Sequence, residues 1–200
     1  SLYTASEAKM ALPDGTTVTL AQETNYPSDG AIQLRVDPAT PTAFPLQLRI
    51  PGWCATGTIA INGEALTRPW KPGSFTAINR TWQAGDTVEL NFDMPLRLVK
   101  GFRAQAGRVA VMRGPQVFTL APQSNEALKD TDLRAITLDP STLSGPTEHD
   151  AIHPDGRACT VKAWRTTSWY PSAKHDFELT LTEYPDPNGE AIYFHVPNPN

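Results

Sequence analysis

Residues 85–95, Gly-Asp-Thr-Val-Glu-Leu-Asn-Phe-Asp-Met-Pro, are the part of the sequence that decides the fold. Four apolar side chains alternate here with three polar ones: Val88, Leu90, Phe92 and Met94 with Glu89, Asn91 and Asp93. Successive side chains of a strand point to opposite faces, so the pattern predicts one apolar and one polar face. An apolar face has to pack against a second sheet. We therefore expect a half-buried antiparallel strand.

The surrounding stretch, Phe44 to Leu98, reads as four or five short strands separated by turns. Residues 44–50 alternate apolar and polar side chains before a turn at Pro51-Gly52. Residues 58–61 lead into Asn62-Gly63, and both of these residues accept the positive φ of a type I′ turn, so a tight hairpin is expected there. Nearer the N-terminus, residues 16–22 and 31–36 predict another pair of strands.

The pattern changes after residue 107. Residues 108–112 and 116–120 are apolar on both faces, which predicts central strands that are covered on both sides. Ala121-Pro122 is interpreted as a domain boundary, giving a β-sandwich domain at 1–122 and a smaller β-rich domain at 123–200.

Within the second domain, residues 124–130 predict a helical turn or two with Ser124 or Asn125 as the cap, and residues 138–150 predict a loop. Residues 177–181 and 192–196 alternate on either side of a Pro185–Gly189 turn, which predicts a β-hairpin.

The composition agrees with an all-β protein, an antiparallel sandwich of jelly-roll-like form. Nineteen prolines and thirteen glycines among 200 residues favour short strands and turns over long helices. The net charge of −4 comes without a Lys/Arg-rich run, so nucleic acid is not an expected partner. Neither a membrane-spanning run nor a signal-peptide pattern is present, which indicates a soluble, unexported protein or a sequence that begins inside a longer chain.

The residues that could carry chemistry each have a simpler interpretation. Glu89 and Asp93 share a face of one strand, where solvation is a better interpretation than a catalytic carboxylate pair. His149 and His153, followed by Cys159, have i,i+4 spacing, but Pro154 shortens any helix that would bring them together.

No catalytic residue, metal ligand or cofactor site is predicted, because the serines also lack a nucleophile elbow and no glycine-rich phosphate loop is present. By its own residues the chain is not expected to be an enzyme.

Two groups of residues leave alternatives open. Cys54 and Cys159 could form one disulfide, although two separate buried thiols are the favoured interpretation. Of the five tryptophans, Trp53 and Trp82 are expected to cap a sandwich core. Trp70 and Trp169 lie in loops and are the ones that could stack on a sugar.

Several segments together resemble the C-terminal β part of the β-L-arabinofuranosidase family, glycoside hydrolase family 127. They lie between residues 1 and 115 and include Leu48-Arg-Ile-Pro-Gly-Trp, Ile61-Asn-Gly, Asn79-Arg-Thr-Trp, Ala84-Gly-Asp-Thr-Val-Glu-Leu and Gly107-Arg-Val-Ala-Val-Met-Arg-Gly-Pro. The resemblance covers residues 2–120 well and residues 160–196 only loosely.

The resemblance implies that catalysis belongs elsewhere. In such enzymes an (α/α)6 barrel carries a glutamate acid/base, a cysteine nucleophile and a zinc ion, and β-sandwich domains follow it. Cys54 and Cys159 do not stand in the catalytic cysteine context, so no site residue is carried over. The implied role is an accessory portion that braces the barrel, forms a subunit interface such as a homodimer, or holds a plant-wall polysaccharide.

Overall fold

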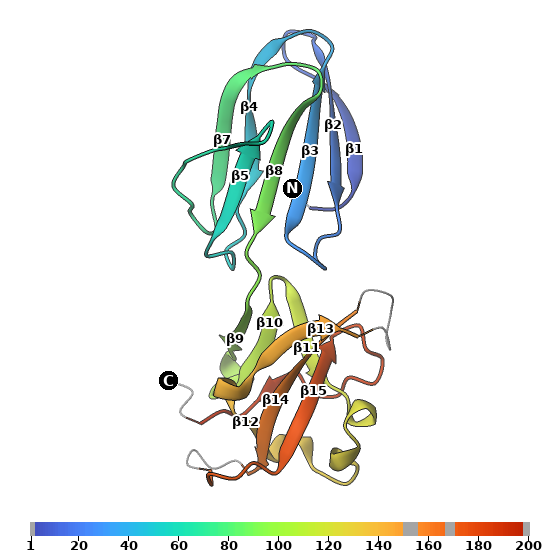
Figure 1. Cartoon of the computed structure of the whole chain (residues 1–200), viewed down its shortest axis with the longest axis vertical. Coiled ribbons are helices and arrows are strands. Elements are labelled where there is room, and N and C mark those ends of the chain that lie inside the picture. The colour runs from blue at the N-terminus through green and yellow to red at the C-terminus, as the bar shows by residue number, and fades with distance from the viewer. Residues whose placement is uncertain (1–2, 150–155, 167–170, 198–200) are drawn as a thin grey trace. The chain divides into compact units, whose positions relative to one another are not determined.

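The computed structural model describes residues 3–149, 156–166 and 171–197. It divides the chain into two compact units, Ser1–Met94 and Pro95–Asn200 (Figure 1). In the described residues every strand pairing within the sheets is antiparallel, and the only helical segments are short 3-10 turns. This confirms the predicted all-β sandwich class.

The first unit consists of two sheets. Six strands form the larger sheet in the order β1-β2-β3-β8-β5-β6: β1 Ser6–Ala11, β2 Thr17–Thr24, β3 Ala31–Pro38, β8 Asp86–Phe92, β5 Gly57–Ile61 and β6 Glu64–Ala65. The smaller sheet pairs β4 (Thr42–Arg49) with β7 (Phe75–Trp82). The apolar core of the unit collects side chains from both sheets.

Strand β8 has the predicted central role. It pairs with β3 on one side and β5 on the other, and Val88, Leu90 and Phe92 are all buried while Glu89 and Asn91 are exposed. The predicted pairing of the two strands after residue 16 is also confirmed, as β2 with β3.

The turn at Asn62-Gly63 confirms the hairpin prediction. Both residues have positive φ, 53° and 80°, and Ile61 pairs with Glu64 across the turn.

The second unit is organised around one large sheet. Its main path runs β12-β14-β15-β11-β10-β16, with β13 beside β14 and β9 beside β10. The strands are β9 Leu96–Lys100, β10 Val109–Arg113, β11 Gln116–Leu120, β12 Ile136–Leu138, β13 Ser144–Glu148, β14 Arg157–Arg165, β15 Phe177–Glu183 and β16 Tyr193–Phe194. The 3-10 turns are η1 Arg103–Gln105, η2 Pro122–Ser124, η3 Glu126–Leu128, η4 Leu133–Ala135 and η5 Pro140–Thr142.

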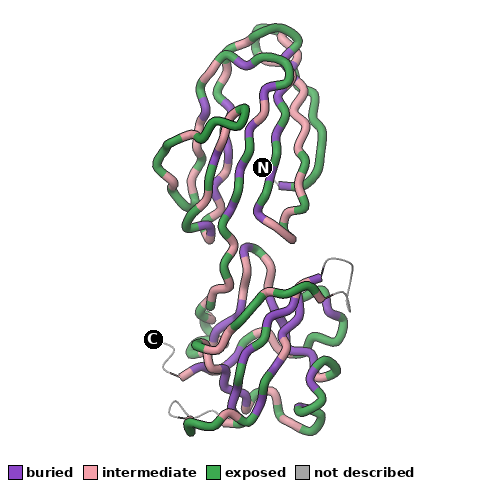
Figure 2. Tube along the Cα trace, viewed as in Figure 1, coloured by how far each residue is buried: buried purple, intermediate pink, exposed green. Residues whose placement is uncertain are grey.

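Strands β10 and β11 confirm the prediction of central, covered strands. Val111, Phe118 and Leu120 are fully buried, and the buried trace runs through these strands in Figure 2. Their partners lie in the second unit, since β11 pairs with β15 and β10 pairs with β9 and β16. The compact units therefore meet at residues 94 and 95, earlier than the boundary predicted at residue 122.

Two predictions for the second unit are wrong. The strands at 177–181 and 192–196 do not form a hairpin, because β15 lies between β14 and β11 while β16 pairs with β10. The segment predicted as a loop at 138–150 contains β13, which pairs with β14. The helical turns at 124–130 are 3-10 turns.

Candidate functional site

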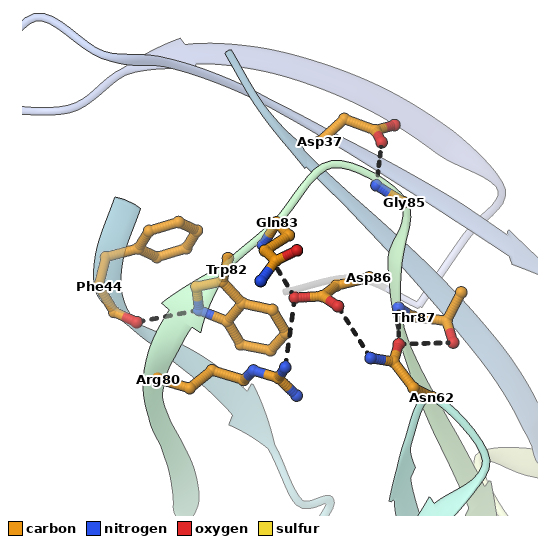
Figure 3. Close-up of polar contacts among 9 residues, drawn as sticks. All are labelled: Asp37, Phe44, Asn62, Arg80, Trp82, Gln83, Gly85, Asp86 and Thr87. Carbon is orange, nitrogen blue, oxygen red and sulfur yellow. Dashed lines mark hydrogen bonds and ion pairs between the residues drawn. The ribbon is translucent and has the colours of Figure 1, made fainter. Parts of the chain in front are cut away.

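The most connected polar site in the first unit is a network around Asp86, at the start of β8 (Figure 3). One carboxylate oxygen, Oδ1, accepts a hydrogen bond of 2.8 Å from Nδ2 of Asn62. The other, Oδ2, accepts one of 2.9 Å from the backbone N–H of Gln83 and lies 3.5 Å from a guanidinium nitrogen of Arg80. Asp86 is only 9% exposed, so these partners replace nearly all of its water.

The network also reaches the Asn62-Gly63 turn and the end of β3. Asn62 turns its Oδ1 to the backbone N–H of Thr87 at 2.8 Å, so a single amide side chain joins the hairpin turn to β8. Asp37, at the end of β3, accepts a hydrogen bond of 2.7 Å from the backbone N–H of Gly85 (Figure 3). We call these residues, Asp37, Asn62, Arg80, Gln83, Gly85, Asp86 and Thr87, the Asp86 clasp.

The charge state of Asp86 is set by two opposed effects. Burial by itself raises the pKa of this carboxyl, but the hydrogen bonds from Gln83 and Asn62 and the charge of Arg80 outweigh it and hold the pKa below its usual range. Asp86 is therefore an ionised hydrogen-bond acceptor at neutral pH. A general acid would need the opposite shift.

The clasp joins three of the segments on which the family resemblance rests. Asn62 belongs to Ile61-Asn-Gly, Arg80 to Asn79-Arg-Thr-Trp, and Asp86 to Ala84-Gly-Asp-Thr-Val-Glu-Leu. The same network borders Trp82, whose indole N–H donates to the carbonyl of Phe44 at 3.0 Å and whose ring lies 5.2 Å from the Arg80 guanidinium. These motif residues thus fix turns and strand ends.

The tryptophans predicted to cap the core do so. Trp82 is fully buried, and Trp53 packs against the core beside Tyr26, with ring centroids 6.5 Å apart. Trp70, which was a candidate for sugar stacking, also packs on this core. Its indole N–H donates to the carbonyl of Cys54 at 2.9 Å, and its ring meets Phe92 edge-on at 6.0 Å. Trp169, the other candidate, lies outside the described residues.

The two carboxylates of the β8 region lie apart from the clasp. Glu89 is exposed on the outer face of the larger sheet, and Asp93 is exposed beyond the strand end, where it accepts a hydrogen bond from the Thr56 hydroxyl. Glu89 is one of the residues that line an open groove of about 650 Å³ on this face, together with Glu23, Gln33, Thr58 and Asn91.

The cysteines and histidines do not converge on one site. Cys54 and Cys159 are free and buried in the cores of different units. Burial raises the pKa of the Cys54 thiol to about 11 and that of the Cys159 thiol to about 12, which suppresses the nucleophilic thiolate at neutral pH. His149 is half-buried, whereas His153 lies outside the described residues. Among the described residues no group of three His, Cys, Asp or Glu could hold a metal ion.

One polar cluster of the second unit was not predicted from the sequence. Nε2 of His175 lies 2.8 Å from Oδ2 of Asp139, and the imidazole stacks on Trp164 with centroids 4.6 Å apart. The Ser141 hydroxyl donates to the same carboxylate and not to the histidine, so the order of groups differs from a nucleophilic triad. Asp139 also accepts from the backbone N–H of Ser141, which makes it the cap of η5.

Residues 1–94 match the family model described as Beta-L-arabinofuranosidase, GH127 middle domain. That range coincides with the first compact unit. A non-reducing end beta-L-arabinofuranosidase of Bifidobacterium longum subsp. longum is 36% identical over 111 residues, covering 50% of this chain and 16% of that protein.

Solved structures resemble both units. A GH127 beta-L-arabinofuranosidase from Geobacillus stearothermophilus T6 is 31% identical, with a TM-score of 0.80, over 98% of this chain and 33% of that chain. A second structure, described as a GH127 beta-arabinofuranosidase, is 26% identical, with a TM-score of 0.78, over 98% of this chain and 34% of that one. The chain therefore corresponds to a part of larger proteins, spanning about a third of each solved relative.

These matches support a relationship to the GH127 glycoside hydrolases. The predicted resemblance was to the C-terminal β part of that family, while the matching family model describes a middle domain. In the described residues no helix is long and apolar enough to span a membrane.

Proposed function

We propose, from its relationship to glycoside hydrolase family 127, that this chain is a non-catalytic accessory portion of an enzyme that acts on arabinofuranosides. In this role the two β-rich units, placed after a catalytic (α/α)6 barrel in the parent protein, brace that barrel or form a subunit interface. The Asp86 clasp is the observation that supports the proposal. In it, residues of the family motifs form hydrogen bonds that stabilise the β-sandwich.

The chemistry of the described side chains supports the same role. The Asp86 carboxylate is ionised and engaged by Asn62, Gln83 and Arg80, and both thiols are buried and protonated at neutral pH. A retaining glycosidase instead needs two accessible groups about 5 Å apart on either side of a bound sugar.

The proposal predicts that the 200-residue chain releases no arabinose from a β-L-arabinofuranoside, while the parent protein does. Deleting the chain from the parent is expected to lower its melting temperature or its yield of folded protein, because the face that it covers becomes exposed to water. Calorimetry and a reducing-sugar assay measure the two effects. Turnover by the isolated chain would contradict the proposal.

A second candidate function, a carbohydrate-binding module, is favoured by the groove on the outer face of the larger sheet. Glu23, Gln33 and Glu89 lie side by side there on β2, β3 and β8, each pairing with the next. Amide and carboxylate groups in such a row can bind the hydroxyl groups of a glycan laid across the strands.

This second function predicts that the chain is retarded in a gel that contains soluble arabinan, and that Gln33→Ala reduces the retardation several-fold. Arg35→Ala is the matched control, because it lies two residues further along the same face of β3 and outside the groove. Equal mobility of the wild-type chain with and without arabinan would exclude arabinan as its ligand.

A further inference from the structure

One segment of the second unit concentrates positive charge. From Pro95 to Asn125 the sequence contains five cations and no Asp or Glu: Arg97, Lys100, Arg103, Arg108 and Arg113. Because the whole chain has a net charge of −4, the remaining residues carry −9. The cations lie on β9 and β10, which pair along their full length, and on the connection between them. We call residues 96–113 the basic hairpin.

Four of the five cations of the basic hairpin have no carboxylate partner within the described residues: no ion pair involves Arg97, Lys100, Arg103 or Arg108. Arg97 is the most constrained of them: one guanidinium nitrogen donates to the carbonyl of Gly114 at 2.6 Å, while its Nε is buried without a hydrogen-bond partner. A half-buried guanidinium that has no carboxylate partner would be stabilised by an anionic group placed next to it.

The connection between the two strands holds an aromatic ring out into water. Phe102 is 79% exposed, the largest exposure among the large apolar side chains described. Beside it, Arg103 has a φ of 52°, in the left-handed region that non-glycine residues rarely adopt, and its guanidinium lies 5.4 Å from the Phe102 ring centre. Strained backbone next to an exposed ring is typical of a functional segment.

Backbone contacts make this connection rigid. Gly101 donates to the carbonyl of Arg108 at 2.8 Å, and Gln105 donates to that of Phe102 at 3.1 Å. A side chain at Gly101 would place its Cβ 2.1 Å from the carbonyl oxygen of Gln105, so the close approach requires glycine. The backbone that carries Phe102 and Arg103 is therefore held in one conformation, which lowers the entropy cost of binding.

Phe102 is the apolar side chain that the connection itself presents. Leu98 and Tyr193 are 36% and 38% exposed on the strands that flank β10, but their pairings with Val111 and Ala110 place them on opposite faces of the sheet. Aromatic residues and arginine are enriched, and acidic residues depleted, at the centres of protein interfaces, where a few such side chains carry most of the binding energy. A protruding aromatic ring fits a hollow in a protein surface, whereas glycan sites present a concave surface to the sugar.

We propose that the basic hairpin docks, through Phe102 and Arg103, into a carboxylate-lined hollow on the remainder of the parent protein. This inference rests on the proposed function, since it assumes a parent of which the chain is one portion. The solved relatives support that assumption, because the chain covers only 33% of the G. stearothermophilus structure. Charge complementarity fixes the chemistry of the partner surface as acidic.

Hydroxyl-radical footprinting tests the proposal through the side chains themselves. The labelling rate of Phe102 is compared between the 200-residue chain and the parent protein, with Tyr184, which is 61% exposed in the same unit, as the internal reference. We expect Phe102 to be labelled about tenfold more slowly in the parent, and Tyr184 at an unchanged rate, because a hot-spot side chain is fully desolvated.

A charge reversal tests the acidic partner. Arg103→Glu in the parent is expected to return the Phe102 rate toward that of the 200-residue chain, whereas Arg103→Lys and the control Lys129→Glu, at another exposed site of the unit, leave it slow. Equal rates in the parent and in the 200-residue chain would overturn the proposal.

Other occupants give different results. Protection of Phe102 in the 200-residue chain that disappears on dilution would replace the parent with a second copy of the chain. Protection that appears there only on addition of polygalacturonate would indicate an acidic glycan. Protection that is already complete in the dilute chain would mean that its own residues cover the ring. Each of these overturns the docking proposal and leaves the proposed accessory role to be decided separately by the turnover assay.

Discussion

Replacing Trp82 with alanine is expected to lower the free energy of unfolding of the first unit by about 3–5 kcal/mol, the usual cost of removing a large buried aromatic side chain. Trp82 is fully buried, and its ring lies against Phe44 with centroids 5.9 Å apart. Its indole N–H also satisfies the carbonyl of Phe44. The substitution would leave a cavity and remove this hydrogen bond. This loss is a large fraction of the total stability of a domain, which is about 5–15 kcal/mol.

Urea unfolding followed by far-UV circular dichroism measures the effect without relying on tryptophan fluorescence. Phe75→Ala is the matched control, because Phe75 lies on the same strand, β7, but is 58% exposed. Its removal is expected to cost less than about 1 kcal/mol. Similar losses in the two variants would mean that Trp82 does not organise the core.

The sequence predicted those parts of the fold that depend on local patterns. The alternation in β8 and the Asn62-Gly63 turn are properties of adjacent residues, and both are found as expected. Strand β1 was not predicted, because all six of its residues are exposed and no apolar alternation distinguishes them. It is a strand because its backbone pairs with β2. Backbone hydrogen bonds do not require particular side chains, so this pairing cannot be read from the residue types.

The order of strands in the second unit depends on contacts between distant residues. After β15 the chain reaches a turn at residues 185–189 that looks like a hairpin turn. Gly189 instead packs against Thr119 of β11, where an added Cβ would lie 2.5 Å from the threonine side chain. The chain thus crosses to β10, where it forms β16. Turn chemistry predicts that the chain reverses but does not specify the strand to which it returns.

The Asp86 clasp could not be predicted from the sequence either, although several of its residues belong to segments that the sequence analysis identifies. The Asn62-Gly63 turn is predicted from its backbone conformation, and both Asn62-Gly63 and Gly85-Asp86 belong to segments of the family resemblance. That the side chains of Asn62, Arg80 and Asp86 meet at one buried point depends on the register between β5 and β8 and on the position of β7. The sequence gives one indication of this site: each of three separate family motifs contains a polar residue that could take part in it.

Removing the carboxylate of Asp86 is the second change with a large expected effect. Asp86→Ala should lower the free energy of unfolding by about 3 kcal/mol, because the Gln83 N–H, the Asn62 amide and the Arg80 guanidinium all lose their acceptor in a mostly buried place. Asp93→Ala, just beyond the other end of β8 and exposed, is the control and should cost well under about 1 kcal/mol. Equal losses in the two variants would show that the clasp contributes little.

The direction of the Asp86 pKa shift also predicts a pH dependence. The pKa of Asp86 in the folded protein is lower than that of an ordinary aspartate, so the folded state favours the ionised form. The stabilisation is therefore fully present above the unfolded pKa, and it is lost as the pH falls through the folded pKa. The difference in stability between wild type and Asp86→Asn should be constant near neutral pH and shrink in acid. If the difference instead grew in acid, the pKa of Asp86 would be raised in the folded protein, and the prediction would be wrong.

A double-mutant cycle with Asn62→Ala separates the clasp from the carboxylate alone. The Asn62 side chain holds Asp86 with its amide N–H and Thr87 with its carbonyl, so the two residues share one set of hydrogen bonds. The two substitutions are therefore expected to be non-additive by about 1 kcal/mol or more when their urea midpoints are compared. Strict additivity would mean that Asp86 acts through Gln83 and Arg80 alone, and that the resemblance motif at residues 61–63 serves only its own turn.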